Sequence, residues 1–439
     1  MREKFKHECT VFAVCWLTYV ITYLCRVNFS SAMLKLSQVM QVNTTQLGTI
    51  GSSFFVVYAV GQLVNGYIGD KISPYKLVAA ALFGTGALNL AIACIDGYLP
   101  LMVLWTLNGY FQSMLWGPLM RILSQHISPS RTVWVSTGMS TSMVVGYITS
   151  WVLFGRCFLP RPWQTYFLVP ALLALAAAVV WTGYLICRRK PAAAVPDAGA
   201  SVSRQSRTGM FRSVVQYRLW LVAVVCLCMG LIKESLSLWS PMLMTEMLGL
   251  EEKTSLTVVA LIPLANFAGI LLTGRFMGKR NDAKRTLRDL FFAAALCSLC
   301  LFFTQRHAAA GGVAALAAIS GLMYGCNSLL LSYLPISFGG ENIVSSLVGL
   351  FDFSSYMGAA LSSALLGVAL EHKSYTAVFT VWLIILCAAC LLTQFFKLKP
   401  TSGPQKPECA GGRRKHPAGR KECRIRKGVK LWIKMKSAH

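Results

Sequence analysis

Residues 10–33 read TVFAVCWLTYVITYLCRVNFSSAM, an apolar run that contains one charged side chain, Arg26. A basic start with Arg2, Lys4 and Lys6 precedes it. A helix needs about 20 mostly apolar residues to cross the hydrocarbon core of a membrane. Because the run is this long and lacks a small-residue cleavage site, we interpret it as a first membrane helix and not as a cleavable signal peptide.

Similar apolar runs recur along the chain, and each is long enough to span a bilayer. Backbone groups in lipid must satisfy their own hydrogen bonds, so these runs are predicted to be helices. The predicted spans are 10–33, 46–69, 75–95, 98–122, 131–154, 163–187, 217–243, 253–276, 286–305, 310–336, 343–370 and 374–397. The sequence therefore predicts an all-α membrane protein with about twelve transmembrane helices.

The composition agrees with a membrane protein. Of the 439 residues, 55% are hydrophobic and 13% are charged, whereas a soluble domain has about 25% charged residues. The formal net charge is +26, and residues 401–439 alone hold twelve Lys/Arg and two Glu. Most other basic residues fall in short loops, which indicates topology signals and contact with the lipid bilayer, not nucleic acid.

Alternate loops carry most of the positive charge. The basic loops contain Lys71 and Lys76, Arg121 and Arg131, six basic residues between Arg188 and Arg212, and five between Lys279 and Arg288. Arg156 and Arg161 go against this alternation. Because basic loops stay in the cytoplasm, we expect a multi-pass protein of the plasma or inner membrane with both termini cytoplasmic.

The predicted spans fall into two sets of six. Residues 188–216 separate the sets and include the small, polar stretch PAAAVPDAGASVSRQSR. We expect two pseudo-symmetric six-helix bundles, 1–187 and 217–397, joined by a cytoplasmic linker, as in many transporters. Residues 398–439 are predicted to be a basic, disordered cytoplasmic tail.

Two Cys-x-x-Cys pairs, Cys297/Cys300 and Cys387/Cys390, stand among the 15 cysteines. Both pairs lie inside apolar runs without further ligand residues, so packing explains them better than metal or redox chemistry. The sequence also lacks a nucleophile–base pattern and a phosphate-cradling Gly-rich loop. We therefore predict no cofactor, no metal site and no enzyme activity.

A short motif follows the second span, Gly66-Tyr-Ile-Gly-Asp70-Lys71. A glycine lets helices approach closely, and an aspartate at a helix end can pair with cations or a helix dipole. An ordinary polar turn is the alternative. The motif resembles the loop between helices two and three of the major facilitator superfamily, which implies gating roles for Gly66, Asp70 and Lys71.

Three further stretches resemble a narrower family: 19–29 (YVITYLCRVNF), 109–121 (GYFQSMLWGPLMR) and 233–241 (KESLSLWSP). They are similar to helices one, four and seven of the organophosphate:phosphate antiporters, a family that includes glycerol-3-phosphate and hexose-phosphate transporters. The resemblance in layout covers about residues 8–397. It implies a major facilitator fold, a small anionic substrate (an organophosphate or phosphate), exchange by alternating access and a monomeric protein.

Two cations carry the interpretation that does not depend on the family. Arg26 and Lys233 each lie about 16 residues into the first helix of a half, where a charge costs about 2.5 kcal/mol or more. A pseudo-two-fold axis would relate them at similar depth. Arginine binds phosphate through a two-pronged fork and lysine as a point charge, so the pair predicts an anion site between the halves.

The alternative is that each cation neutralises a buried acid. Asp352 could pair with either one. Glu234 follows Lys233 directly, and adjacent residues on a helix are predicted not to face each other. Asp352 and Glu234 could instead carry a coupled proton. Aromatic and amide residues that could line the cavity are Tyr19, Tyr23, Gln112, Trp116, Tyr324, Asn327 and Tyr356, and the matched motifs favour Tyr23 and Gln112.

The chain also departs from the family it resembles. Glycerol-3-phosphate members have Lys after the helix-one Arg, where this chain has Val27, and a His near Ser142. Fewer cations weaken selection for a dianion and leave room for a carboxylate or phosphonate. Two rivals therefore stay open: proton-coupled transport of another organic anion, and a sugar-phosphate sensor without transport.

Overall fold

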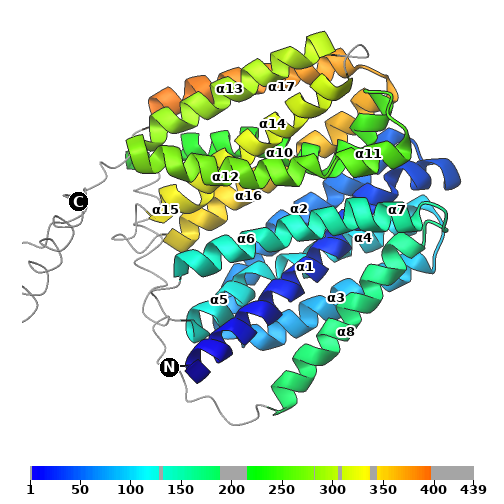
Figure 1. Cartoon of the computed structure of the whole chain (residues 1–439), viewed down its shortest axis with the longest axis vertical. Coiled ribbons are helices and arrows are strands. Elements are labelled where there is room, and N and C mark those ends of the chain that lie inside the picture. The colour runs from blue at the N-terminus through cyan, green and yellow to red at the C-terminus, as the bar shows by residue number, and fades with distance from the viewer. Residues whose placement is uncertain are drawn as a thin grey trace, which may run out of the picture. The chain divides into compact units, whose positions relative to one another are not determined.

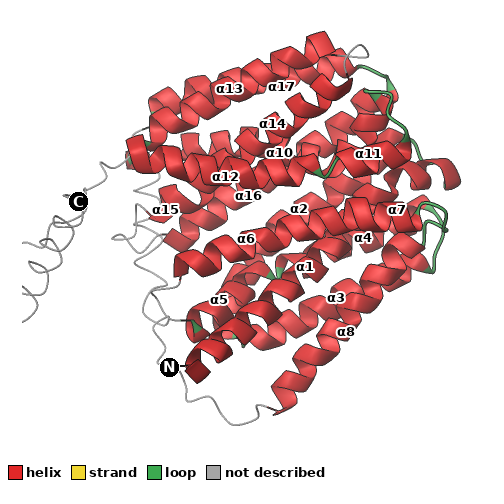
Figure 2. Cartoon of the chain, viewed as in Figure 1, coloured by secondary structure: helices red, strands yellow, loops and turns green. Residues whose placement is uncertain are grey.

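The computed structural model describes residues 2–127, 132–187, 215–280, 282–304, 309–336 and 344–396. Every regular element within these ranges is helical, and they contain no strand (Figure 2). The predicted tail and nearly all of the predicted linker lie outside the described residues. The division at 188–216 therefore stays a prediction.

The elements before the linker carry the first predicted spans. They are α1 (Arg2–Val39), α2 (Thr44–Lys71), α3 (Pro74–Ala93), α4 (Tyr98–Ser113), α5 (Trp116–His126), α6 (Thr132–Ile148), the π-helical η2 (Thr149–Phe154), α7 (Gly155–Phe158) and α8 (Thr165–Cys187). Within this set α1, α3 and α8 contact one another (Figure 1).

The elements after the linker carry the other spans. They are α10 (Leu219–Glu246), α11 (Glu252–Val258), α12 (Leu261–Arg280), α13 (Ala283–Thr304), α14 (Ala309–Ser328), the π-helical η3 (Leu329–Tyr333), α15 (Leu334–Ile336), α16 (Val344–Glu371), α17 (Tyr375–Leu392) and the 3₁₀ turn η5 (Thr393–Phe395). Here α14 lies between α12 and α13, and α13 also packs on α17 (Figure 1).

Among the described residues, ten helices are long and apolar enough to cross a membrane. The two remaining predicted spans, 98–122 and 131–154, are interrupted helices: α4 continues into α5, and α6 continues into η2. The sequence prediction of an all-α membrane protein is thus confirmed. The predicted spans 253–276 and 310–336 are interrupted as well, the first between α11 and α12 and the second at η3.

The break between α4 and α5 has a local cause. Pro118 has no N–H to donate to the Met114 carbonyl four residues earlier, and its ring crowds that carbonyl. The preceding amides instead make shorter-range bonds, from Met114 N to Phe111 O (3.2 Å) and from Leu115 N to Gln112 O (3.3 Å). This turn lies directly after Gln112, inside one of the motifs that the sequence singled out.

Four helices, two from each set, meet where the site lies. α2 packs along α16, α10 packs on α16, and α1 crosses α10, where the Ser30 hydroxyl donates to the Leu238 carbonyl. Close approach of α2 and α16 depends on Gly48 and Gly367: a Cβ on Gly48 would lie 2.6 Å from the Ser363 carbonyl oxygen, and one on Gly367 2.5 Å from that of Thr44. Small residues thus bring these backbones together around α1 and α10.

Candidate functional site

Arg26 projects from α1 into a cage of aromatic rings. Its guanidinium carbon lies 4.5 Å from the ring centre of Tyr58, 5.4 Å from that of Tyr356, and 5.8 Å from those of Tyr23 and Phe54. Its Nη2 donates a hydrogen bond to the Tyr356 hydroxyl at 3.1 Å. Among the described ion pairs none includes Arg26. The guanidinium is therefore stabilised by ring faces and one neutral oxygen.

Lys233 on α10 has a different environment, and it is 5% exposed. Its Nζ lies 2.9 Å from Glu234 Oε1 and donates to Asn327 Oδ1 at 3.0 Å. Its ammonium is 5.3 Å from the Tyr324 ring centre and 5.9 Å from that of Tyr356. Lys233 is thus in an ion pair, whereas Arg26 takes part in none of those that the structure describes.

The expectation that Lys233 and Glu234 cannot meet, because they are adjacent on a helix, is wrong. The spacing rule describes the directions in which Cβ atoms leave the helix. A lysine stem of four carbons and a glutamate stem of two are long enough to curl toward each other beyond those directions. Away from water both charges gain from this pairing.

Asp352 lies half-buried on α16 and takes part in none of the described ion pairs. Its charge still acts on Lys233, Glu234 and Arg26. The four groups carry two formal positive and two formal negative charges. The centre is therefore close to neutral when both carboxylates are ionised, which differs from the surplus of positive charge that the two cations alone predicted.

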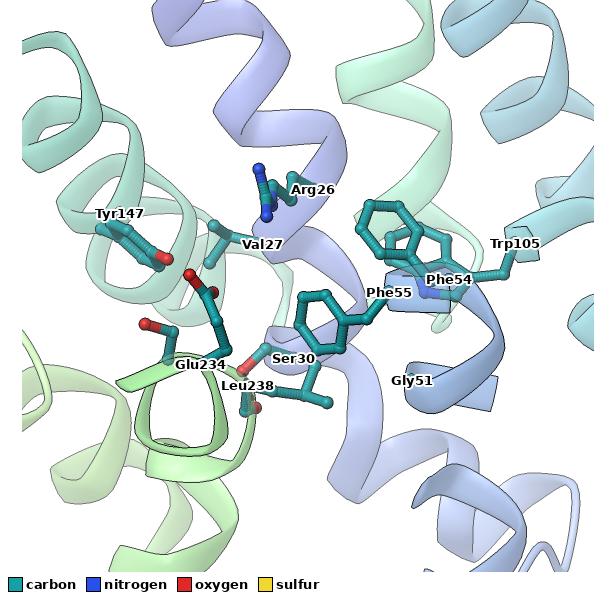
Figure 3. A pocket seen from close by; sticks show the side chains of 11 residues that line it. Arg26, Val27, Ser30, Gly51, Phe54, Phe55, Trp105, Tyr147, Glu234 and Leu238 are labelled. Carbon is teal, nitrogen blue, oxygen red and sulfur yellow. Dashed lines mark hydrogen bonds between the residues drawn. The ribbon is translucent and has the colours of Figure 1, made fainter. Parts of the chain in front are cut away.

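A small cavity lies next to these groups (Figure 3). The lining residues come from α1, α2, α4, α6 and α10: Arg26, Val27, Ser30, Gly51, Phe54, Phe55, Trp105, Tyr147, Glu234, Ser237 and Leu238. Of the predicted site residues, Arg26 and Glu234 line it. Its free volume is about 20 Å³, room for a water molecule but not for a phosphate ester. A larger ligand would enter only if the helices part.

Four other predicted site residues lie on α1 or pack against it: Tyr19, Tyr23, Gln112 and Trp116. The Tyr19 ring packs against Trp116 in a tilted arrangement (ring centres 4.8 Å apart) and edge-on against Tyr23 (5.2 Å), and Tyr23 lies 5.3 Å from Tyr147. Gln112 is 2% exposed and donates from Nε2 to the Cys25 carbonyl at 2.8 Å. Contact of these residues with a substrate stays a prediction, because none of them except Tyr23 reaches Arg26 in the described contacts.

The predicted gating residues Gly66, Asp70 and Lys71 lie in the last two turns of α2. Their side chains are outside the described part of the structure. The motif is helical, which differs from the polar turn that was its alternative interpretation. Its gating role stays a prediction.

Sequence reasoning missed Phe54, Tyr58 and Tyr147. Phe54 and Tyr58 are one turn apart on α2, so both rings face the same way, and both lie against Arg26. This spacing was visible in the sequence. It gave no sign that the face meets Arg26, because that depends on how α2 crosses α1.

Comparison with known proteins adds a family and a set of relatives. A family model described as Major Facilitator Superfamily matches residues 15–362. The chain is 23% identical over 392 residues to the membrane sensor protein UhpC of Salmonella typhimurium, covering 86% of this chain and 88% of that protein. It is 21% identical over 421 residues to a probable hexose phosphate transport protein of Chlamydia pneumoniae, covering 90% and 92%.

The fold also matches solved structures. A crystal structure of a bacterial homologue of the human lysosomal transporter Spinster, in an inward-facing and unoccupied conformation, superposes with a TM-score of 0.70. The alignment covers 90% of this chain and 99% of that chain at 12% sequence identity. At this identity the likeness establishes the fold alone.

Proposed function

Because the chain belongs to the major facilitator superfamily, we propose that this membrane transporter moves a small organic anion in exchange for phosphate. The substrate is a phosphate ester such as glycerol 3-phosphate or a sugar phosphate. The likeness to a probable hexose phosphate transport protein supports this substrate class. The shared motifs on helices one, four and seven point the same way.

Arg26 is the observation that carries the proposal. It lies where helices of the two halves meet, and the hydroxyl that it contacts comes from α16. Its described partners are ring faces and one neutral oxygen, so its charge is available to an anion. An arginine can hold two phosphate oxygens through parallel N–H bonds, which makes it the anchor for the phosphoryl group.

Lys233 is the second cation of the proposed site. Asn327 and Glu234 hold its ammonium 3.0 and 2.9 Å away. An incoming phosphate competes with the Glu234 carboxylate for this ammonium. Arg26 thus binds the anion first, and Lys233 binds it after the ion pair between Lys233 and Glu234 breaks.

Alternating access is supported by where the described hydrogen bonds between the halves lie. Beyond the central bonds from Arg26 to Tyr356 and from Ser30 to the Leu238 carbonyl, Ser363 Oγ donates to the Gly48 carbonyl at 3.0 Å, and Asn43 Nδ2 to Glu371 at 3.0 Å. These contacts join the first turns of α2 to the last turns of α16, the end that the loop charges predict to be outside. Breaking these hydrogen bonds would open the site on that side.

The test is exchange in reconstituted vesicles. Vesicles loaded with phosphate should take up labelled glycerol 3-phosphate or glucose 6-phosphate, and vesicles without an internal anion should not. Arg26→Gln should abolish this uptake. Uptake that a proton gradient drives equally well without any internal counter-anion would reject exchange.

A second function, proton-coupled transport of an organic anion, is favoured by the Lys233–Glu234 pair. With both carboxylates ionised the four central charges sum to zero, so a bound anion then leaves the site negative unless a carboxylate takes a proton. Glu234 and Asp352 are the candidate carriers. A pH jump across phosphate-free vesicles should then drive uptake, and Glu234→Gln or Asp352→Asn should remove the response.

The likeness to a membrane sensor protein favours a third outcome. A sensor would bind a sugar phosphate without moving it. Tight binding of glucose 6-phosphate to the purified protein, with neither exchange nor proton-driven uptake in vesicles, would identify this function.

A further inference from the structure

A chain of hydrogen bonds between buried amides runs behind Arg26. Phe29 N–H donates to Asn28 Oδ1 at 3.0 Å, and Asn28 Nδ2 donates to Asn89 Oδ1 at 2.8 Å. Asn89 Nδ2 contacts Asn108 Oδ1 at 3.3 Å, and Asn108 Nδ2 donates to the Cys25 carbonyl at 3.2 Å. The chain leaves α1, crosses α3 and α4, and returns to α1.

The two ends of this chain are a matched donor and acceptor. In a regular α-helix, the N–H of residue 29 donates to the carbonyl of residue 25. Here Phe29 N–H and the Cys25 carbonyl both have side-chain partners, and Gln112 adds a second donor to that carbonyl at 2.8 Å. Arg26 is part of this turn. The backbone that carries the guanidinium is therefore held from α3 and α4.

Packing alone does not explain why four buried positions behind Arg26 carry amide side chains. Asn28, Asn89, Asn108 and Gln112 are each at most 2% exposed. Apolar side chains of the same size pack such positions without the desolvation cost of an amide. Gln112 Oε1 has no partner among the described residues. The side chain thus makes its hydrogen bond to the Cys25 carbonyl although its own carbonyl oxygen is left without one. A buried polar network of this kind fixes one local geometry.

We propose that Asn28, Asn89, Asn108 and Gln112 are positioning residues for Arg26. They fix the turn from Cys25 to Phe29 so that the guanidinium faces the place of the anion. A two-pronged arginine–phosphate contact needs such orientation, whereas a point charge needs less. The inference rests on the proposed function and changes the role of Gln112, which acts on the α1 backbone and not on the substrate.

Asn89→Leu is the sharpest variant, because Asn89 links Asn28 to Asn108 and lines none of the described cavities. Asn65→Leu is its matched control. Asn65 is also buried, and it donates to Ser113 on α4 at 2.7 Å without touching α1 in the described contacts. Each change is made in the full chain with Arg26 and with Arg26→Lys, and the affinity for inorganic phosphate is measured by calorimetry together with the thermal midpoint.

We expect Asn89→Leu to weaken phosphate binding about tenfold, and Asn65→Leu to change it less than twofold at a similar loss of thermal midpoint. In the Arg26→Lys background Asn89→Leu should add nothing, since contacts that act through one group are not additive. Equal effects of the two leucine variants, or the same tenfold loss in both backgrounds, would show a merely structural role and overturn the inference.

Hydrogen–deuterium exchange gives a second readout that needs no ligand. Peptides covering residues 24–30 should exchange faster in Asn89→Leu and at the native rate in Asn65→Leu. Unchanged exchange in Asn89→Leu would also overturn the inference. Unaltered phosphate binding in Arg26→Gln would instead remove the proposed function, and the exchange rates would still show whether the amides hold this turn.

Discussion

Arg26 and Lys233 occupy comparable places on α1 and α10, and the protein stabilises them in opposite ways. Arg26 lies within 5.8 Å of four ring centres and bonds to one neutral hydroxyl. Lys233 lies 2.9 Å from the Glu234 carboxylate. The same sequence pattern, one basic residue deep in an apolar helix, is thus stabilised by ring faces in one case and by a carboxylate in the other.

The difference has a consequence for ligand binding. Cation–π contacts contribute roughly 0.5–2 kcal/mol each, and they leave the net charge in place. A carboxylate cancels the charge and becomes costly to leave unpaired. Under the proposed function, Arg26 can therefore bind an anion directly, whereas Lys233 must first exchange one anion for another.

The largest expected effect tests whether Lys233 and Glu234 stabilise each other. Lys233→Met leaves Glu234 buried without its partner, and breaking a buried ion pair in this way costs about 3–5 kcal/mol. The thermal midpoint of the purified protein should fall steeply. In the double variant Lys233→Met/Glu234→Met it should return close to the native value, because no charge is left unpaired. A double variant as unstable as the single one would show that the pair is not the cause.

The next effect tests whether Arg26 is the open cation. Arg26→Gln removes the anchor for the anion, and we expect phosphate affinity to fall about a hundredfold, or about 2.7 kcal/mol. Stability should change little, since no carboxylate loses its partner. Arg285→Gln is the control, because Arg285 is 71% exposed and pairs with Asp282 at the surface. A steep loss of thermal midpoint in Arg26→Gln would mean that Arg26 is paired like Lys233.

A smaller effect, an increase in phosphate affinity, would test the difference between Arg26 and Lys233 further. Glu234→Gln keeps an acceptor for Lys233 but removes the competing negative charge. Phosphate affinity should rise about tenfold, or about 1.4 kcal/mol. Asp289→Asn, which removes a half-exposed carboxylate on α13, should leave affinity unchanged. Weaker phosphate binding in Glu234→Gln would show that Glu234 supports the substrate and does not compete with it.

Much of this fold was visible in the sequence. The twelve predicted spans correspond to helical segments, because lipid allows few alternatives to a helix over 20 apolar residues. Both cations were also visible, since a charge in such a run is rare. The prediction that Lys233 and Glu234 do not face each other was wrong. Their pairing depends on the reach of two flexible side chains, which helical spacing does not describe.

The aromatic cage around Arg26 could not be predicted from the sequence, for a different reason. Tyr58 and Tyr356 lie on α2 and α16, and the close packing of these helices at Gly48 and Gly367 brings their rings to 4.5 Å from each other. Gln112 shows the same limit. Its motif marked it as important, but only the crossing of α1 and α4 shows that its amide faces the Cys25 carbonyl. Residue types were predictable where their partners were not.

Tyr356 connects the two cations and gives the smallest expected effect. Its ring centre lies 5.4 Å from Arg26 and 5.9 Å from Lys233. Tyr356→Phe keeps the ring and removes one neutral acceptor, which a bound anion replaces, so phosphate affinity should change less than about threefold, below 0.7 kcal/mol. Tyr356→Leu also removes the ring and should lower the thermal midpoint further than Tyr356→Phe, because Arg26 then loses one of its ring faces. If the phenylalanine and leucine variants have the same midpoint, ring faces are not what stabilises Arg26, and the distinction between the two cation sites loses its basis.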